Sequence, residues 1–401
     1  MTSVAVLKFG GTSLSTPELR ELAAMRVREA LARGLRPVAV VSAMGRAPDA
    51  YATDTLLQLA GDGAVDRNAD LLLSCGELIS AALFAVELER NGIRATALSG
   101  AQAGIITDRS HGDASILRVD PARVQDAIDA GAVPVVAGFQ GVTEDGVITT
   151  LGRGGTDLTA VAIGHALEAD QVDIYTDVPG ALTADPARVR GAHTIERVRL
   201  EEMAELSSLG ARVMHRKAAA YAQHAGLPYA IRELRSGAGT VVDDRVAHAE
   251  PVSGVTATGE VTWFRIIRGE AGTRERRMQV ELEMFARLAD AGLSLDQVTI
   301  NQSGVAFAIA GNRGGEVSDL LVDLNLAVRV RERCAKLSVV GAGMRGQPGV
   351  VHRVVRALSD ANVEIIHCTD SHITISVLVP LDDAQLAEQA VHDEFHLEKA
   401  E

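Results

Sequence analysis

The chain has 401 residues, more than one ordinary hydrophobic core organises, so we expect two or three domains. Hydrophobic residues make up 47% of it and aromatic residues only 3%, which excludes wholesale disorder and favours buried parallel strands of Ala, Val, Leu and Ile. The formal net charge is −14 and no local run of Lys and Arg stands out, which argues against a nucleic acid partner.

The cysteines and the apolar segments indicate in which cellular compartment the protein is expected. The three cysteines form no C-x-x-C pair, so neither a disulfide framework nor a zinc site is expected, and the histidines suggest no metal site. The start of the chain lacks the basic and apolar regions of a signal peptide, and no apolar run reaches the roughly 20 residues that span a bilayer. We therefore expect a cytoplasmic protein without a membrane partner.

Short apolar runs alternate with amphipathic helical patterns through the first 240 residues. The run VAVLKF precedes a helix that begins near Pro17, with Thr16 as its expected N-cap. Later strands are expected at RPVAVVSAM, RATALSG, AVPVVAGFQGV, VDIYTDV and LPYAIREL. This alternation predicts an α/β domain with a mainly parallel sheet flanked by helices.

A repeat follows a Gly-, Ser- and Pro-rich boundary at residues 236–254. RLADAGLSLDQVTI and ALSDANVEIIHCTD align so that Leu288 meets Leu358 and Gly292 meets Asn362. Gly and Asn favour the left-handed turn that ends a helix. Two copies, each reading strand, helix, strand, strand, helix, predict two small α/β domains. The expected domains are 1–245, 252–332 and 333–401.

The second copy opens with a G-x-G-x-x-G pattern at Gly341, Gly343 and Gly346, the usual dinucleotide fingerprint. A dinucleotide fold needs several further βα units after this loop. Only 55 residues follow Gly346, and they already belong to the repeat. We therefore expect a tight strand-to-helix loop, which can still bind a ligand at the helix N-terminus.

The segment LKFGGTS, Leu7–Ser13, has the parts of a phosphate site. A strand delivers Lys8, two glycines expose backbone amides, and a helix begins. It is not a Walker A loop. An edge lysine before an ordinary glycine turn is the alternative.

Three further segments can carry chemistry. Arg153 sits between glycines before a helix, where it can hold a carboxylate through two hydrogen bonds, with Thr156 as an N-cap and Asp157 as a first-turn acid. Thr176 ends a strand, and ligands of open α/β sheets bind beyond such ends; a turn-rich loop is the alternative. Glu77 follows a glycine at the start of an apolar helix, either as a first-turn acid or facing an ammonium group.

Taken together, KFGGTS, VVSAMG, YATDTLL, SCGELIS, AGFQGVT, GRGGTD, IYTDVPG and LTADP resemble the motifs of aspartate kinases, in that family's order and over nearly the whole chain. SVVGAGMRGQPGV and DSHITISVLV resemble the second ACT domain of the short, lysine-pathway type from Bacillus-like bacteria. The resemblance implies an amino-acid kinase fold followed by two ACT-like βαββαβ domains. It also implies transfer of the γ-phosphoryl group of ATP to the β-carboxylate of L-aspartate, giving 4-phospho-L-aspartate, the first step of the aspartate-family pathway.

The same resemblance assigns residues. Catalysis falls to Lys8, which neutralises the phosphoryl group, to Asp157, which orients Lys8, and to Arg153, which holds the substrate α-carboxylate. The ATP positions are Lys8, Phe9, Gly10, Gly11, Ser42, Thr176, Asp177, Thr183, Ala184, Asp185, Pro186, Arg188 and Arg212. The aspartate positions are Thr53, Glu77, Arg153, Gly154, Gly155 and Thr156. The effector positions are Met344, Gly346, Pro348, Gly349, Val350, Asp370 and Ser371. Mg²⁺ arrives with ATP, and no metal cage of the protein is expected.

Three departures from the family pattern stand out. Arg212 and Arg216 replace a lysine and a proline of G-A-K-V-x-x-P. The segment 231–235 reads IRELR instead of V-R-S-[TS]-F, and the first ACT copy reads RGEAGTRERR where a D-x-P-G loop is usual. The alternatives are a kinase for glutamate or an acylated amino acid, and an amino-acid sensor with an inactive kinase domain. Lysine, threonine and diaminopimelate all remain open as effectors, and a homodimer or larger homo-oligomer is expected.

Overall fold

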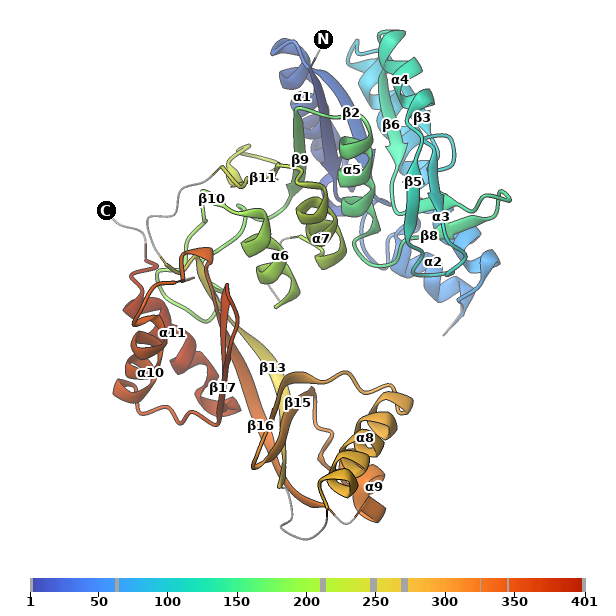
Figure 1. Ribbon diagram of the computed structural model, residues 1–401. Helices are drawn as coiled ribbons and strands as arrows, with labels where there is room; N and C mark the ends of the chain where they lie inside the picture. The colour runs from blue at the N-terminus through green and yellow to red at the C-terminus, as the bar shows by residue number, and fades with distance from the viewer. Residues whose placement is uncertain are drawn as a thin grey trace. The chain divides into compact units, whose positions relative to one another are not determined.

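The computed structural model describes residues 3–61, 65–209, 214–245, 251–267, 273–324, 326–344 and 346–398. The chain divides into two compact units (Figure 1). Unit 1 comprises Met1–Leu182 and Thr194–Ala247, and unit 2 comprises Thr183–His193 and His248–Glu401. The short segment 183–193, expected in the first domain, thus belongs to unit 2.

Unit 1 is built on an eight-stranded sheet. Its neighbours are parallel except for the antiparallel pair β11 and β12, as the alternation of strands and helices predicted. In sheet order the strands are β10 (Arg197–Val198), β12 (Gly239–Val242), β11 (Tyr229–Glu233), β9 (Gln171–Thr176), β1 (Val4–Phe9), β2 (Arg36–Val41), β6 (Val133–Ala137) and β3 (Ala95–Leu98).

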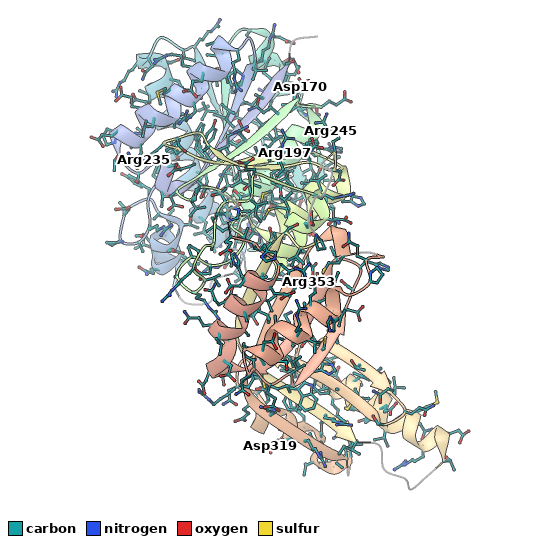
Figure 2. The ribbon with its side chains drawn as sticks, turned by 90° about the vertical axis from the view of Figure 1, so that its left-hand side faces the viewer. Asp170, Arg197, Arg235, Arg245, Asp319 and Arg353 are labelled. Atoms are coloured by element: carbon teal, nitrogen blue, oxygen red, sulfur yellow. The ribbon has the colours of Figure 1, made fainter. Side chains whose placement is uncertain are left out.

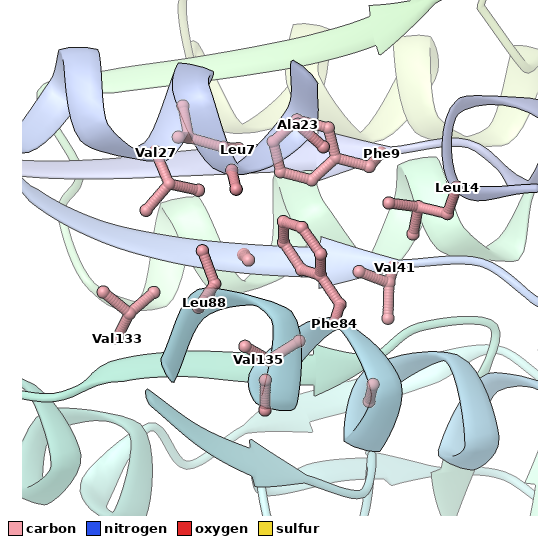
Figure 3. Packing of buried hydrophobic residues seen from close by; sticks show 14 of the residues in the cluster. Leu7, Phe9, Leu14, Ala23, Val27, Val41, Phe84, Leu88, Val133 and Val135 are labelled. Carbon is pink, nitrogen blue, oxygen red and sulfur yellow. The ribbon is translucent and has the colours of Figure 1, made fainter. Parts of the chain in front are cut away.

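Helices cover this sheet, and α1 and α3 share a core with alternate residues of the central strands. The ring centroid of Phe9 lies 5.4 Å from that of Phe84 of α3 (Figure 3). Phe9 also stacks on Tyr175, with 5.2 Å between the ring centroids. Thr16 caps α1 by accepting a hydrogen bond from Leu19 N, as predicted. The helical elements are η1 (Gly11–Leu14), α1 (Pro17–Ala32), α2 (Thr53–Ala60), α3 (Arg67–Arg90), α4 (Ala122–Asp129), α5 (Gly155–Ala166), α6 (Leu200–Ser208) and α7 (Arg216–Ala225).

Helix α3 is long and apolar enough to cross a membrane by length and composition alone, and it is the one such helix within the described ranges. Its Leu73, Phe84 and Leu88 are nevertheless buried in unit 1. A core helix of a soluble protein can have the same length and composition, so the packing of α3 accounts for its apolar character.

A four-stranded sheet interrupts the alternation in unit 1. The run AVPVVAGFQGV, expected as one strand, is two: β6 ends at Ala137 and β7 begins at Gln140, in different sheets. The break has a physical cause. Phe139 has a left-handed backbone, with φ 66°, and a Cβ on Gly138 would lie 2.5 Å from Thr156 Cγ2. In sheet order the strands are β5 (Ile116–Val119), β4 (Ile105–Thr107), β7 (Gln140–Val142) and β8 (Ile148–Thr150).

Unit 2 contains one antiparallel six-stranded sheet whose two longest strands run through both repeats. The far end of β13 pairs with β15, whereas Gly254–Ala257 at its start pairs with Leu337–Val340. The sheet of the second repeat is therefore completed by the start of β13, which lies in the range expected for the first repeat. The strands, in sheet order, are β14 (Asp296–Asn301), β15 (Gly304–Ala310), β13 (Gly254–Ile267), β16 (Ala327–Val340), β18 (Thr374–Pro380) and β17 (His367–Asp370).

The repeat itself is confirmed in the helices. Leu288 and Leu358 are both fully buried, and the helices that contain them end in left-handed residues, Gly292 with φ 69° and Asn362 with φ 57°. In Figure 1 helices lie against each half of the sheet. These are α8 (Arg274–Asp290) and α9 (Gly314–Leu321) in the first half, and α10 (Val350–Asp360) and α11 (Ala384–Glu394) in the second, with short turns η2 (Val322–Leu324), η3 (Ala342–Met344) and η4 (Leu381–Asp383).

The glycines of the G-x-G-x-x-G pattern connect β16 to α10. A Cβ on Gly341 would lie 2.1 Å from Pro251 O, so a side chain has no room there. Gly346 has φ 74° and Gly349, the N-cap of α10, has φ 93°. The pattern thus serves a strand-to-helix connection in an antiparallel sheet, as expected, and not a dinucleotide fold.

Candidate active site

The phosphate-type loop lies where β1 ends in unit 1. Lys8 reaches across to α5, and its Nζ lies 2.7 Å from Asp157 Oδ1. Asp157 is in the first turn of α5, as predicted. A Cβ on Gly11 would lie 2.3 Å from Ala43 O, which leaves room only for glycine. The structure therefore brings a lysine, a helix N-terminus and two glycine amides to one place.

The loop from β8 to α5 holds Arg153 between two glycines with left-handed backbones, Gly152 with φ 74° and Gly154 with φ 72°. The Arg153 side chain is exposed. Gly154 is the N-cap of α5, so the expected N-cap role of Thr156 is wrong; Thr156 is the second residue of the helix and is buried. The cap is a glycine because the loop needs the left-handed conformation that Thr disfavours.

His215 is a residue of this site that sequence reasoning missed. A Cβ on Gly154 would lie 2.0 Å from His215 Cγ, so the imidazole packs directly against the Arg153 loop. Burial lowers the pKa of His215, opposed by the nearby charge of Asp157. Asp113, which forms an ion pair with Lys217, lies against Gly152 on the other side. No spacing in the sequence relates these residues to residues 152–154, so only the fold reveals them.

Glu77 lies within α3, which starts ten residues earlier at Arg67; the expectation of a first-turn acid is therefore wrong. Its side chain is 2% exposed. One carboxyl oxygen accepts a hydrogen bond from Ala43 N at 3.1 Å, while Oε2 lacks a hydrogen-bond partner among the described residues. Burial raises the pKa of Glu77 to about 8, against the lowering effect of hydrogen bonds from Ala43 N and Thr53. Two residues assigned to aspartate, Glu77 and Thr53, are thus in contact.

A cavity of about 340 Å³ opens in unit 1 between η1 and the ends of β9 and β11. Its lining comprises Thr12, Ser13, Ser15, Leu19, Thr176, Asp177, Glu233, Leu234 and Arg235. Two expected nucleotide positions are therefore beside the unusual segment 233–235. Arg26, nearly buried, fixes that segment by donating two hydrogen bonds to Leu234 O at 2.9 and 2.8 Å.

The loop after β2 borders the same region. Ser42 N donates to Phe9 O at 3.2 Å, and Gly45 N donates to Gly11 O at 3.1 Å. Arg46, a cation that sequence reasoning missed, lies 3.5 Å from Asp177 Oδ2. Ser42 is thereby held beside the strand that delivers Lys8.

The other expected nucleotide positions do not line this part of unit 1. Arg212 lies outside the described residues. Those in unit 2 are Thr183, Ala184, Asp185, Pro186 and Arg188. The effector positions also lie in unit 2, either from η3 to the first residue of α10 or at the end of β17 and in the turn after it, where Thr374 N donates to Ser371 Oγ at 3.0 Å. Across the described ranges no group of three or more His, Cys, Asp or Glu is arranged to hold a metal ion.

Comparisons with known proteins agree with this geometry. The amino acid kinase family model matches residues 3–233, and an ACT domain model matches residues 337–395. Aspartokinase 1 of Bacillus subtilis (strain 168) is 40% identical, over 99% of this chain and 100% of its own length. Aspartokinase of Geobacillus stearothermophilus is 38% identical, over 98% of this chain and 97% of its own length.

Solved structures show the same fold. The crystal structure of Escherichia coli aspartokinase III in complex with aspartate and ADP superposes with a TM-score of 0.76 at 25% identity, over 98% of this chain and 100% of that one. Clostridium acetobutylicum aspartate kinase gives a TM-score of 0.83 at 21% identity, over 98% and 100% of the two chains. With an amino acid kinase model over residues 3–233, an ACT domain model over residues 337–395 and full-length relatives of this similarity, the chain belongs to the aspartokinase family.

Proposed function

We propose that this protein is an ATP-dependent aspartate kinase, which phosphorylates the β-carboxylate of L-aspartate to 4-phospho-L-aspartate. The observation that carries the proposal is the ion pair of Lys8 and Asp157 at the N-terminus of α5, next to Gly10 and Gly11. The names of the relatives, and the aspartate and ADP in the E. coli structure, support the choice of substrates.

The chemistry needs no general base. A side-chain carboxylate with a pKa of about 3.9 is already ionised at pH 7, so the difficulty is bringing one anion up to a polyanion. Positioning and charge neutralisation supply the catalysis. Lys8 supplies the positive charge to the transferring phosphoryl group, the amides of Gly10 and Gly11 donate hydrogen bonds, and Asp157 holds the Lys8 ammonium in place.

Aspartate is recognised through its α-carboxylate and its α-ammonium group. Arg153, with Gly154, Gly155 and Thr156 around it, holds the α-carboxylate. Glu77 and Thr53 receive the α-ammonium. Because its pKa is about 8, Glu77 is mostly neutral at pH 7 in the empty site. An approaching cation favours the charged form of a carboxyl group, so binding of aspartate ionises Glu77 and releases a proton.

On the nucleotide side, Ser42, Thr176 and Asp177 of unit 1 contact ATP, whereas Phe9 can do so only through its backbone, because its ring is buried in the core. Mg²⁺ arrives as part of the co-substrate, bridging its phosphates. The remaining nucleotide positions belong to the segment 183–193 of unit 2.

The direct test is incubation of the purified protein with ATP, Mg²⁺ and aspartate, with hydroxylamine trapping of the acyl phosphate. Lys8→Ala should lower kcat by at least about 100-fold, because it removes the main charge facing the phosphoryl group. Arg33→Ala, an exposed cation at the end of α1, is the matched control and should leave the rate unchanged. Turnover of glutamate but not aspartate would overturn the choice of substrate, and an inactive wild type would favour the sensor alternative.

Regulation is assigned to unit 2. An amino-acid effector binds between β16 and α10 and at Asp370 and Ser371, and the protein works in the cytoplasm as a homodimer or larger homo-oligomer. A thermal-shift screen of lysine, threonine and diaminopimelate identifies the effector, since a ligand that binds only the folded state raises its stability. No shift with any of them, together with no inhibition, would remove the regulatory part of the proposal.

A further inference from the structure

Helix α11 of unit 2 has buried residues on two faces of opposite character, one apolar and one polar. Ala384, Ala387 and Val391 pack in the core of the second repeat. On another face, four polar side chains follow the i, i+3, i+4, i+7 spacing of a single helical stripe. We call Gln385, Glu388, Gln389 and His392 the polar stripe. Glu388 is 1% exposed and His392 0%, although charged residues are seldom fully buried without a partner.

The inner members of the polar stripe each contact the segment 183–193, which we call the docked loop. Glu388 Oε2 lies 3.0 Å from Arg188 Nε, and His392 Nε2 lies 3.0 Å from Thr183 Oγ1. Both pairs are within unit 2. Glu388 and His392 thus each have one polar contact with this loop, while His392 Nδ1 lacks a hydrogen-bond partner among the described residues.

The outer members of the polar stripe bind the backbone of the docked loop. Gln385 Nε2 donates to Arg188 O at 2.9 Å. Gln389 exchanges two hydrogen bonds with Arg190, accepting from its N at 2.7 Å and donating to its O at 3.2 Å. Strand β13 adds one more, from Val255 N to Thr183 O at 2.8 Å. Because backbone groups are bound as well as side chains, the path of the loop is fixed over residues 183–190.

The docked loop leaves unit 1 at Leu182 and returns to it at Thr194, and these two residues form an antiparallel bridge that closes the base of the loop. The loop also contains the five nucleotide positions, Thr183–Pro186 and Arg188, that the family resemblance assigns. The segment expected to meet ATP is therefore held by a helix of the C-terminal repeat.

We propose that the polar stripe of α11 positions the docked loop for ATP, so that Glu388, Gln389 and His392 are positioning residues of the nucleotide site. It follows that Arg188 serves to fasten the loop to Glu388, whereas the resemblance assigned it to the nucleotide. This inference rests on the proposed function, because it takes ATP as the ligand of the loop.

The test compares two carboxyl groups of the same helix. Glu388→Gln keeps the shape of the side chain and removes the charge that holds Arg188. Glu394→Gln is the control, because Glu394 forms ion pairs with Arg353, labelled in Figure 2, and Arg356 of α10 and with no residue of the docked loop. We expect Glu388→Gln to raise KM for ATP roughly tenfold, since misplacing a binding loop by about 1 Å has large effects. KM for aspartate and kcat should stay within about twofold, a split that general destabilisation would not produce.

Hydrogen exchange of residues 183–193 gives a readout that does not depend on activity. Protection of this segment should fall in Glu388→Gln and stay at the wild-type level in Glu394→Gln. If Glu388→Gln does not fold, Gln389→Ala, on the rim of the contact, should raise KM for ATP and lower protection in the same direction. Equal KM for ATP and equal protection in the Glu388 and Glu394 variants would overturn the inference. Loss of protection in a protein that never phosphorylates aspartate would retain the docking and refute the proposed function instead.

Discussion

Two buried glutamates, one in each unit, show how the same chemical group takes different roles. Glu77 in unit 1 accepts a hydrogen bond from Ala43 N, its Oε2 lacks a partner among the described residues, and burial raises its pKa to about 8. Glu388 in unit 2 is equally buried but is paired with Arg188, and its pKa is raised only to about 7. A buried acid without a cation is suited to receive one from a ligand, whereas an acid with a built-in cation joins two segments of the chain.

The largest effect is expected for Glu77→Gln, the substitution of the glutamate that has no cation of its own. The substitution removes the charge offered to the substrate ammonium in a desolvated site, so KM for aspartate should rise roughly 100-fold. KM for ATP should change less than about twofold. Glu89→Gln, on the exposed side of α3, is the matched control for steady-state kinetics. A Glu77 variant with an unchanged KM for aspartate would show that Glu77 is merely a structural acid.

The protonation of Glu77 predicts a pH dependence of aspartate binding. Below its pKa of about 8 the empty site holds a neutral carboxyl, and binding must displace its proton. Affinity for aspartate should therefore rise by about tenfold or more from pH 6 to pH 8. Calorimetry at pH 7 in two buffers with different ionisation enthalpies should detect release of close to one proton per site. A proton count of zero in the wild type, equal to that of Glu77→Gln, would contradict the prediction.

The Arg188–Glu388 pair predicts a pH dependence of folding stability rather than of ligand binding. Arg188→Ala leaves Glu388 buried without its cation, which raises its pKa further. The folded state then holds a proton that the unfolded chain gives up near pH 4.5, so stability falls as pH rises through the range between the two pKa values. We expect Arg188→Ala to cost about 1–2 kcal/mol of unfolding free energy at pH 8 and less at pH 6. Urea denaturation at the two pH values measures this; a larger cost at pH 6 would refute it.

The smallest expected effect concerns ATP. Protonation of Glu388 below about pH 7 weakens its pairing with Arg188, so KM for ATP should rise about threefold from pH 8 to pH 6. The groups that act on Glu388 are Arg188 and Asp185 of the docked loop and the backbone of Ala257 in β13. Glu388→Gln supplies the baseline for the titration of ATP itself. If KM for ATP depends on pH in the same way in Glu388→Gln and the wild type, Glu388 does not contribute to that dependence.

Local pattern predicted much of this molecule. The Lys8 strand, the glycine turn and Asp157 in a first helical turn all depend on neighbours in sequence, and the structure contains them. The repeat could also be predicted, because the left-handed backbone at the same place in each copy favours Gly292 and Asn362.

Long-range packing explains what the sequence could not predict. The burial of Glu77 depends on its position within α3, which Asp66 caps eleven residues earlier by accepting hydrogen bonds from Asn68 N and Ala69 N. His215 meets Gly154 through the packing of the fold, without any spacing between them in sequence. The docked loop lies in the middle of kinase-type sequence, yet its polar partners come from α11, some 200 positions away.

The strand sharing in unit 2 has a consequence for how the protein is made. Gly254 at the start of β13 pairs with Val340 at the end of β16, and the rest of the first repeat lies between them in the chain. During synthesis the second repeat cannot complete its sheet until the first has been made, and closing that long loop slows folding. A chain cut between the repeats would leave the C-terminal piece without a strand. The two repeats should therefore unfold together, as one cooperative unit.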